Sequence, residues 1–340
     1  MTHLLILCGG QSPEHSISIR STRNILSAID RNKYDLTIVG ISQMGNWWLV
    51  SEEELQDTIL DEGRAVNIYP GSEAPIQVED ASLPAIDVVF PLLHGPNGED
   101  GTIQGLLKLL CLPFVGPAHL SSAVCMDKEI TKRILRDAGI LVAPWEVIRK
   151  GDEIPSYQDL ADKLGEVLFV KPANMGSSVG VHRVSSEDEW RTAIEDALKY
   201  DRKVLVEQSI SGRELECAVL GNEHPKASGV GEVQSGNFYS YSEKYDDSSE
   251  AQTVIPANID HAHVPNLQKT AVAAYKALDC QGMSRVDMFI TEEGQIFINE
   301  VNTIPGFTSI SMYPKLWEEA GIPYAELIDQ LITLAMERGS

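Results

Sequence analysis

Short apolar runs alternate with stretches of helical periodicity along most of the chain, and this alternation constrains the fold more than any other feature. Apolar runs of about four to eight residues, bounded by glycine or proline, are typical of buried strands. The stretches between them repeat apolar residues every third or fourth position, as one face of a helix does. A chain that alternates in this way builds sheets covered by helices. We therefore expect an α/β fold.

The pattern places most elements along the chain. We expect strands at residues 4–8, 36–41, 87–90, 167–170, 203–207, 284–291 and 295–299. We expect helices at residues 16–28, 102–110, 127–138, 186–199 and 264–278, and a last helix with Pro323 at its first position. Asp127 is the expected N-cap of its helix, because a carboxylate there accepts hydrogen bonds from unpaired N–H groups. Residues 61–84 are rich in Gly, Pro and acidic residues and are expected to form a variable excursion.

Composition excludes several classes of protein. The 340 residues predict two or three domains, and the formal charge of −23 argues against a duplex nucleic-acid binder or a protein that docks on anionic lipid. Apolar runs are all too short for a membrane helix, and the first run lacks the basic flank of a signal peptide. The five cysteines form no C-x-x-C pair, so we expect a reduced cytosolic protein in which all five are core residues.

Two predicted strands near the C-terminus carry oxygen ligands suited to a metal ion. If Glu293 and Gly294 form a two-residue turn, Asp287 lies directly opposite Glu300. Asn302 shares their face, because side chains alternate along a strand. Two carboxylates and an amide oxygen suit Mg²⁺. A solvated acidic hairpin would show the same pattern.

Two loops carry residue types that suit a nucleotide. Residues 173–180, rich in Gly and Ser, follow Lys171 and a buried strand, so their N–H groups can approach phosphate. An ordinary turn between strands would look similar. Residues 235–249 hold Tyr245, two more tyrosines and Lys244, which predicts a lid that closes over a ligand. The alternative is a loop packed on its own domain.

Two polar residues lie in loops after strands of the first predicted domain. Glu14 opens a helix, where a carboxylate suits an ammonium group or merely complements the helix dipole. His94 precedes a glycine loop with two acids, and by itself it is typical of a satisfied core histidine.

Taken in order, these segments resemble the D-alanine–D-alanine ligase family of the ATP-grasp superfamily through nearly the whole chain. The motifs that carry the resemblance are Gly9-Gly10-x-Ser12-x-Glu14-His15, His94-Gly95-x-x-Gly98-Glu99-Asp100-Gly101, Met126-Asp127-Lys128, Lys171-Pro172, Gly176-Ser177-Ser178-Val179-Gly180, Lys244-Tyr245, Arg285-x-Asp287 and Asn299-Glu300-Val301-Asn302-Thr303-x-Pro305-Gly306. The resemblance implies an ATP-grasp fold of three α/β domains, with ATP held between the second and third. The implied domains are residues 1–117, 118–210 and 211–340.

The resemblance also implies an activity and its site residues. The family joins two D-alanines for the peptidoglycan precursor, through a D-alanyl phosphate. The implied ATP ligands are Lys128, Lys171, Ser177 and Lys244 at the phosphates, and Glu207, Gln208, Ile210 and Glu214 at adenine and ribose. The implied metal ligands are Asp287, Glu300 and Asn302. The implied D-alanine contacts are Glu14 at the first ammonium, His94, and Ser311 with the Met312 backbone at the second carboxylate. Arg285 and the Gly306 N–H would stabilise an oxyanion, and Glu14, Ser177 and Tyr245 would form a link that closes the lid.

The implied partners are D-alanine, ATP, a pair of Mg²⁺ or Mn²⁺ ions, and a monovalent cation such as K⁺. A cytoplasmic homodimer that binds neither nucleic acid nor membrane is expected. The alternatives are an ATP-grasp ligase with another acceptor such as D-lactate, and a nucleotide-binding module without turnover. A nicotinamide-linked Rossmann enzyme is set aside because no G-x-G-x-x-G follows the first strand.

Overall fold

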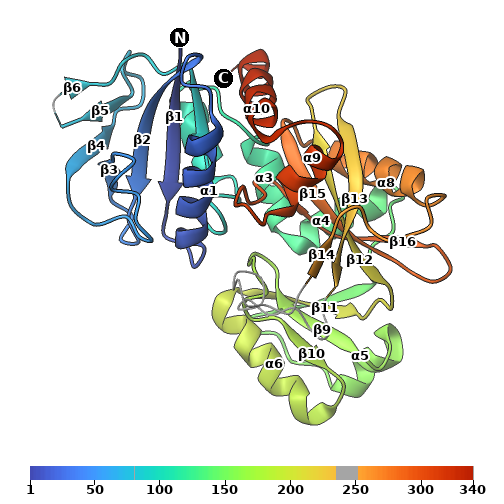
Figure 1. Ribbon diagram of the computed structural model, residues 1–340. Helices are drawn as coiled ribbons and strands as arrows, with labels where there is room; N and C mark the ends of the chain where they lie inside the picture. The colour runs from blue at the N-terminus through green and yellow to red at the C-terminus, as the bar shows by residue number, and fades with distance from the viewer. Residues whose placement is uncertain (80, 235–251, 340) are drawn as a thin grey trace.

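Three β-sheets with their helices make up the protein. The structure is a computed structural model that describes residues 1–79, 81–234 and 252–339. Figure 1 shows the N-terminal sheet on the left, the central sheet at the bottom and the C-terminal sheet on the right. The expected α/β fold is confirmed.

The N-terminal sheet begins with the apolar run at the start of the chain. β1 (Thr2–Gly9) pairs in parallel with β2 (Tyr34–Ile41) and with β7 (Val88–Pro91). Because parallel strands end at the same edge of a sheet, the loops after β1 and β7 lie close together there. One leads into α1 (His15–Ala28) and the other into α2 (Thr102–Leu109).

Residues 61–84 were expected to form a variable excursion, but the described residues among them add strands to this sheet. The strand order is β6-β5-β4-β3-β2-β1-β7, and the pairings from β2 to β6 are antiparallel. The Gly and Pro residues of the segment indicated loops, but short runs between them alternate apolar and polar residues as strands do. Val66, Ile76 and Val78 of these runs are buried. The added strands are β3 (Trp47–Leu49), β4 (Arg64–Ile68), β5 (Ile76–Val78) and β6 (Ala81–Ser82).

The central sheet is antiparallel, with the strand order β10-β9-β11-β8. Its own apolar core includes the fully buried Trp190 on the helix that packs on it. The elements of this region are α3 (His119–Met126), α4 (Lys128–Asp137), β8 (Trp145–Arg149), α5 (Tyr157–Leu164), β9 (Leu168–Pro172), β10 (His182–Val184), α6 (Glu187–Tyr200) and β11 (Lys203–Gln208).

The C-terminal sheet is also antiparallel, with the strand order β14-β13-β12-β15-β16. Pro323 is the N-cap of the last helix rather than its first residue, one position from the prediction. The elements are β12 (Arg213–Leu220), β13 (Lys226–Gln234), β14 (Gln252–Val254), α8 (Val264–Ala277), β15 (Met283–Ile290), β16 (Ile296–Asn302), α9 (Met312–Glu319) and α10 (Tyr324–Arg338).

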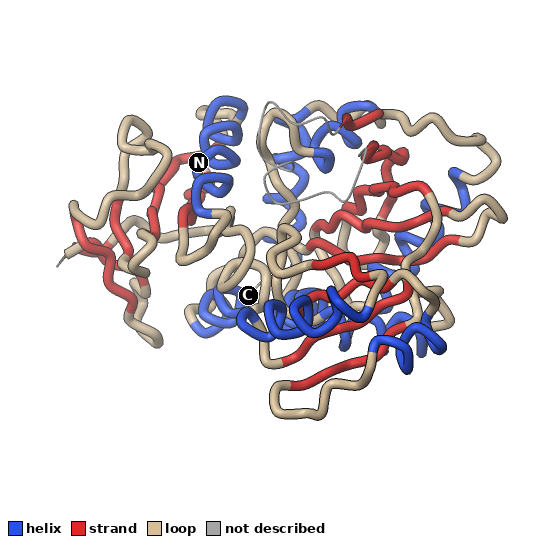
Figure 2. The backbone as a smooth tube through the Cα atoms, turned by 90° about the horizontal axis from the view of Figure 1, so that it is seen from below, coloured by secondary structure: helices blue, strands red, loops and turns tan. Residues whose placement is uncertain are grey.

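A shared core joins the N-terminal and C-terminal sheets. α10 packs against α1 and β7, α9 packs on β12 and β13, and the Phe307 ring before α9 meets Phe90 edge to face with centroids 5.7 Å apart. Cys125 of α3 and Leu135 of α4 belong to the core of the C-terminal sheet. Figure 2 shows helices between the strands of the N-terminal sheet and those of the rest of the chain. The N-terminal and C-terminal sheets are therefore held together by apolar packing, whereas the central sheet has a core of its own.

All five cysteines are free thiols. Four are buried, as expected, but Cys111 is exposed in a left-handed turn after α2, with a φ of 54°. The expectation that every cysteine is a core residue is wrong at that position.

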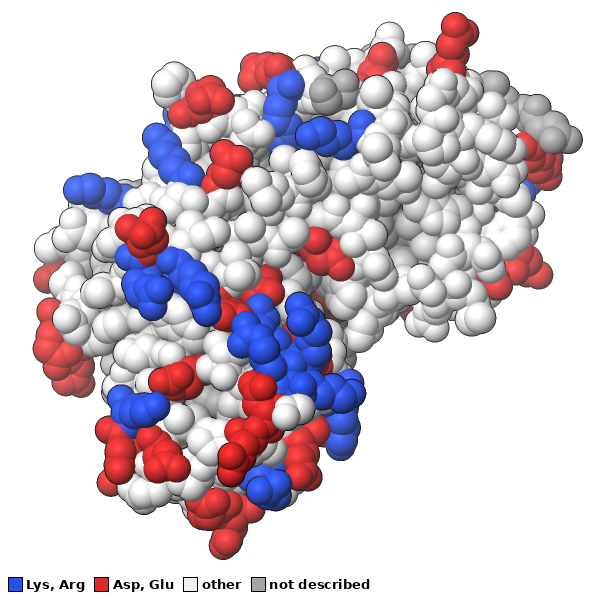
Figure 3. Space-filling model, turned by 180° about the vertical axis from the view of Figure 1, so that it is seen from behind, with Lys and Arg blue, Asp and Glu red and all other residues white. Residues whose placement is uncertain are grey.

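Basic side chains gather locally although acidic residues dominate the composition. On the face seen in Figure 3, Lys and Arg side chains form groups with Asp and Glu among them, over part of the surface. In the described part of the chain, no helix combines the length and apolar character that crossing a bilayer requires.

Candidate active site

A cleft of about 590 Å³ is lined by residues of the central and C-terminal sheets and their loops, together with α1 and the loops after β1 and β7 of the N-terminal sheet. Most residues that the sequence analysis singled out line this cleft. These are Glu14, His94, Lys128, Lys171, Ser177, Glu207, Gln208, Ile210, Glu214, Arg285, Asp287, Glu300, Asn302, Gly306, Ser311 and Met312. Lys244 and Tyr245 lie outside the described residues.

Glu14 faces the cleft rather than the backbone of α1. It occupies the N-cap position of that helix, yet its side chain makes no capping hydrogen bond. Its carboxylate instead accepts a hydrogen bond from the Ser177 hydroxyl at 2.6 Å, although 163 residues separate the two along the chain. Glu14 as a residue is only 8% exposed, so a cationic ligand there would meet a largely desolvated charge.

The Gly/Ser loop takes a conformation that serines adopt rarely. Ser177 and Ser178 have positive φ angles of 51° and 59°, in the left-handed region that favours glycine. Such residues concentrate at ligand sites, where the surrounding contacts hold them. One contact comes from Lys128, whose Nζ donates to the Met175 carbonyl at 2.7 Å. The ordinary-turn interpretation is therefore weaker than the ligand-binding one.

Two predicted cationic residues reach the cleft from different elements. Lys128 is the first residue of α4, and its Nζ lies 3.7 Å from a carboxylate oxygen of Glu300. Lys171 projects from β9, and its Nζ lies 2.7 Å from a carboxylate oxygen of Glu207 on β11. Lys171 and Glu207 are diagonal neighbours on one face, because Lys171 pairs with Leu205 and Glu207 with Phe169.

Sequence reasoning missed Lys132, the second partner of Glu207. Its Nζ lies 3.2 Å from the other carboxylate oxygen of Glu207, and its side chain is 1% exposed. The available signal was its position four residues after Lys128, on the same face of α4. Burial raises the pKa of Glu207, but Lys132 and Lys171 outweigh that effect and hold it below its usual value.

The hairpin with the candidate metal ligands has the predicted register but a different turn. Thr291 and Gln295 close a three-residue loop, with Gly294 at a φ of 79°, rather than a two-residue turn. An irregularity then follows, because Met288 pairs with Ile298 whereas Asp287 pairs with Glu300. Asp287 and Glu300 are opposite each other, as predicted, because the bulge offsets the longer loop.

Three acidic residues lie abreast across the C-terminal sheet. Asp287 on β15 pairs with Glu300 on one side and with Glu216 of β12 on the other. Arg285 neutralises two of them, with its guanidinium 2.7 and 2.8 Å from Asp287 oxygens and 2.9 Å from Glu216. Burial lowers the pKa of Arg285, but these carboxylates raise it well above its usual value. Glu216 was missed, although its two-residue spacing from Glu214 indicated a shared face.

The donor set at this hairpin fits a hard cation. Asp287 and Glu300 supply carboxylate oxygens, and Asn302 lies beside them with its amide donating to Asp287 at 2.9 Å. No three His, Cys, Asp or Glu side chains of the described residues are grouped closely enough to hold an ion by themselves. An amide oxygen would therefore be needed as the third protein ligand, and oxygen ligands of this kind suit Mg²⁺ or Mn²⁺.

His94 is both a buried histidine and part of the cleft wall. It is 3% exposed, and its ring nitrogens lie 3.1 Å from the Ser21 hydroxyl and 3.1 Å from the Ile304 carbonyl. Burial lowers the pKa of His94, but Glu99 and Glu14 outweigh it, so the pKa lies above its usual value. The ring therefore links loops of the N-terminal and C-terminal sheets beside Glu14.

The far end of the cleft is formed by the loop before α9. Ser311 is the N-cap residue of this helix, and its hydroxyl accepts a hydrogen bond from the Thr308 N–H at 2.9 Å. A Cβ at position 306 would lie 2.7 Å from the Ser311 hydroxyl oxygen, so a side chain there would displace that hydroxyl. The Gly306 backbone, Ser311 and the start of a helix thus line one wall, an arrangement suited to an anion.

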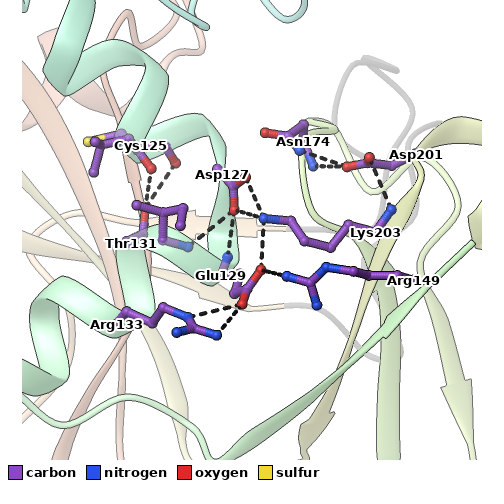
Figure 4. A network of polar contacts seen from close by, with 11 residues as sticks. Cys125, Asp127, Glu129, Thr131, Arg133, Arg149, Asn174, Asp201 and Lys203 are labelled. Carbon is purple, nitrogen blue, oxygen red and sulfur yellow. Dashed lines mark hydrogen bonds and ion pairs between the residues drawn. The ribbon is translucent and has the colours of Figure 1, made fainter. Parts of the chain in front are cut away.

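A buried ionic network fixes the start of α4, where Lys128 lies (Figure 4). Asp127 caps this helix as predicted, accepting hydrogen bonds from the N–H groups of residues 129 and 130. Lys203 of β11 lies 2.6 Å from Asp127 and 2.9 Å from Glu129. The backbone reinforces the link, because the Lys128 N–H donates to the Ala173 carbonyl and the Ala173 N–H to the Lys203 carbonyl.

Replacing Lys203 with methionine is expected to lower the free energy of unfolding by about 3 kcal/mol, because two largely buried carboxylates lose their shared cation. Denaturant unfolding measures the change. Lys163→Met is the control, since Lys163 lies 3.5 Å from Glu146 in an exposed pair, and about 0.5 kcal/mol or less is expected. Equal losses in the two variants would contradict this interpretation of the network.

Two protein-family descriptions together match nearly the whole chain. The family described as "D-ala D-ala ligase N-terminus" matches residues 3–117, and the one described as "D-ala D-ala ligase C-terminus" matches residues 134–333. Both matches include residues that line the cleft.

Individual relatives are similar over their full length. The D-alanine–D-alanine ligase of Oceanobacillus iheyensis is 48% identical, covering 98% of this chain and 94% of the relative. The VanG D-Ala:D-Ser ligase of Enterococcus faecalis is 37% identical, with a TM-score of 0.90, covering 98% of this chain and 99% of the other. The D-alanine–D-alanine ligase of Bacillus anthracis complexed with ATP is 29% identical, with a TM-score of 0.77, covering 99% and 98%.

Proposed function

The chain belongs to the D-alanine–D-alanine ligase family, and we propose that it joins two D-alanine molecules into D-alanyl-D-alanine while ATP is cleaved to ADP and phosphate. It is a carbon–nitrogen ligase of the ATP-grasp fold that serves peptidoglycan precursor synthesis. The observation that carries this proposal is the single cleft in which lysines, carboxylates, Arg285 and the Ser311 loop converge. A protein that only binds nucleotide would not need the ends of the cleft at Glu14 and Ser311, which suit an ammonium group and a carboxylate.

We propose that ATP lies against the central sheet. Lys128 and Lys171 would bind its phosphates together with the loop that carries Ser177, and Lys244 would bind the γ-phosphate. Glu207, Gln208 and Ile210, where β11 ends, would contact adenine, and Glu214 the ribose. The support is that Lys128 and Lys171 enter the cleft from two elements beside the Gly/Ser loop.

The metal site would lie at the hairpin. Asp287, Glu300 and Asn302 would hold a pair of Mg²⁺ or Mn²⁺ ions, whose charge helps to neutralise the phosphates during phosphoryl transfer. Lys128, close to Glu300, adds positive charge at the same place.

In the first step, Glu14 would hold the ammonium group of one D-alanine. An oxygen of the D-alanine carboxylate would attack the γ-phosphorus, the bond from that phosphorus to the β-phosphate oxygen would break, and ADP would leave. The resulting acyl phosphate has a good leaving group, which the free carboxylate lacks. The protein supplies orientation and a water-poor cleft for this step.

In the second step, the amine of another D-alanine would attack the acyl carbon. Arg285 and the Gly306 N–H would stabilise the oxyanion that develops, and phosphate would depart with one former carboxylate oxygen. Ser311 and the Met312 backbone would hold the acceptor carboxylate, with His94 lining the site. The link between Glu14 and Ser177, extended to Tyr245, would shield the acyl phosphate from water.

We further propose three α/β domains at residues 1–117, 118–210 and 211–340, with residues 235–249 as the lid. A cytoplasmic homodimer activated by a monovalent cation such as K⁺ is the organisation that the resemblance favours. Gel filtration with light scattering tests the dimer, and turnover with K⁺ replaced by a bulky organic cation tests the activation.

Phosphate release with ATP, Mg²⁺ and D-alanine tests the proposed function, with product identification by mass. Release that depends on D-alanine, with D-alanyl-D-alanine as product and no reaction with L-alanine, is expected. D-Serine and D-lactate are offered in competition with D-alanine. A dominant D-alanyl-D-serine or D-alanyl-D-lactate product would replace the proposal with the alternative acceptor.

A further inference from the structure

Lys132 is a buried cation that the proposed mechanism leaves without a task. Its side chain is 1% exposed, and its Nζ donates to the Ala143 carbonyl at 3.2 Å and lies 5.8 Å from the centre of the Trp145 ring. Placing an ammonium group in such surroundings is costly unless a counter-ion repays the lost hydration. Glu207 is that counter-ion.

Glu207 is held between two lysines on opposite oxygens. Lys132 contacts one carboxylate oxygen at 3.2 Å and Lys171 contacts the other at 2.7 Å. Glu207 and Lys171 belong to the cleft lining described by the structure, whereas Lys132 does not. The three side chains therefore form a line of alternating charge that starts inside the protein and ends at the cleft.

This arrangement of charges affects ATP binding because two anions, Glu207 and an ATP phosphate, compete for the ammonium group of Lys171. In the structure its ammonium group is bound to Glu207, while the proposed function requires it to bind an ATP phosphate. If Lys171 were the only cation on Glu207, its transfer to phosphate would leave a buried carboxylate without a counter-ion. A second lysine on that carboxylate removes this obstacle.

We propose that Lys132 is a positioning residue for nucleotide binding, an inference that rests on the proposed ATP site. It keeps Glu207 neutralised, so that Lys171 is able to turn from that carboxylate to the phosphates of ATP. Lys132 acts through Glu207 and Lys171 and touches neither ATP nor D-alanine.

The charge state of Lys132 adds a pH dependence to the same geometry. Burial, with Lys171 and Lys128, outweighs the opposing effect of Glu207 and lowers the pKa of Lys132 to about 8. Arg136 is a further cation nearby, 5.2 Å from the centre of the same Trp145 ring. Above about pH 8 the neutral amine no longer offsets Glu207, so Lys171 is retained by that carboxylate. ATP binding must then weaken as the pH rises.

Calorimetric titration with ATP and Mg²⁺, without D-alanine, tests the proposal on the full chain. At about pH 7, Lys132→Met is expected to raise the Kd for ATP about tenfold. In kinetics the KM for ATP rises while kcat at saturating ATP changes little. Arg136→Met is the matched control, because Arg136 belongs to the same helix and also lies over the Trp145 ring, but its side chain is exposed. The Arg136→Met variant is expected to bind ATP like the wild type.

A double variant separates this role from simple packing. Because Glu207 is itself proposed to contact adenine, the double variant, Lys132→Met with Glu207→Gln, is compared with Glu207→Gln alone. Removing Lys132 is expected to raise the Kd for ATP far less in that background than in the wild type. In the wild type, the Kd for ATP should rise up to about tenfold between about pH 7 and pH 9. The same range should leave the Kd of Lys132→Met nearly constant.

Three results would overturn the proposal: wild-type ATP affinity in Lys132→Met, an equal effect of Lys132→Met in the wild-type and Glu207→Gln backgrounds, or a wild-type Kd for ATP that does not change with pH. The pH titration of the wild type decides the matter even where Lys132→Met fails to fold. Dipeptide formation by the same wild-type preparation is assayed in parallel. If no dipeptide forms while ATP still binds, the proposed function is overturned, but the effect of Lys132 on ATP binding can still be measured.

Discussion

Replacing Arg285 with methionine is expected to lower kcat for dipeptide formation by roughly 10² to 10³, the loss typical of one oxyanion donor. Its guanidinium faces the cleft and is held by Asp287 and Glu216, which fix its orientation. A preorganised cation stabilises charge that develops in the transition state without having to move. The KM for ATP is expected to change far less, and steady-state kinetics separate the two quantities.

Arg213→Met is the matched control for this variant. Arg213 makes the same forked contact, with both distances to Glu232 at 2.7 Å, but it lies outside the cleft lining. It should lose a little stability and keep its kcat. Arg285→Lys retains the charge without the fork, so its kcat should fall between those of the wild type and Arg285→Met. A wild-type kcat in Arg285→Met would exclude the oxyanion role.

Replacing Glu300 with glutamine is expected to lower kcat about a hundredfold at fixed Mg²⁺, because one carboxylate ligand of the proposed metal site becomes a neutral amide. The Mg²⁺ concentration that gives half-maximal activity should rise strongly, and titrating Mg²⁺ at saturating ATP measures it. Removing the metal with a chelator should abolish turnover in the wild type, and added Mg²⁺ should restore it.

Glu293→Gln is the control for the hairpin. Glu293 lies in the loop of the same hairpin, and its side chain is exposed, so its loss should change neither kcat nor the Mg²⁺ requirement. If Glu300→Gln shows the same Mg²⁺ titration as the wild type, Glu300 is not a metal ligand. The solvated-hairpin interpretation would then be the better one.

The sequence predicted the register of this hairpin for an incomplete reason. An assumed two-residue turn at Glu293 and Gly294 placed Asp287 opposite Glu300, and the structure has them opposite each other. The turn itself has three residues, and an irregularity at Asn299 restores the alignment. Face alternation is a strong constraint because a one-residue slip would turn every side chain to the wrong side. Bulges leave no such signal in the sequence.

Most strands and helices were predictable, because their apolar periodicity is local. Asp127 as a helix cap, for example, followed from its chemistry and is confirmed. The packing of α3 and α4 against the C-terminal sheet was not predictable, because it depends on contacts between distant segments. The same limit explains why Lys132 and Glu216 were missed. Each becomes a cleft-related residue only when another element supplies its partner.

The fate of the D-alanine carboxylate oxygen tests the central claim most directly. D-Alanine labelled with ¹⁸O in its carboxylate is supplied with ATP and Mg²⁺, and the released phosphate and the product are analysed by mass. We predict that each dipeptide formed is accompanied by a phosphate carrying one ¹⁸O atom, because the acyl phosphate passes that oxygen to phosphate. Unlabelled phosphate, with or without dipeptide, would contradict activation of the carboxylate in this cleft.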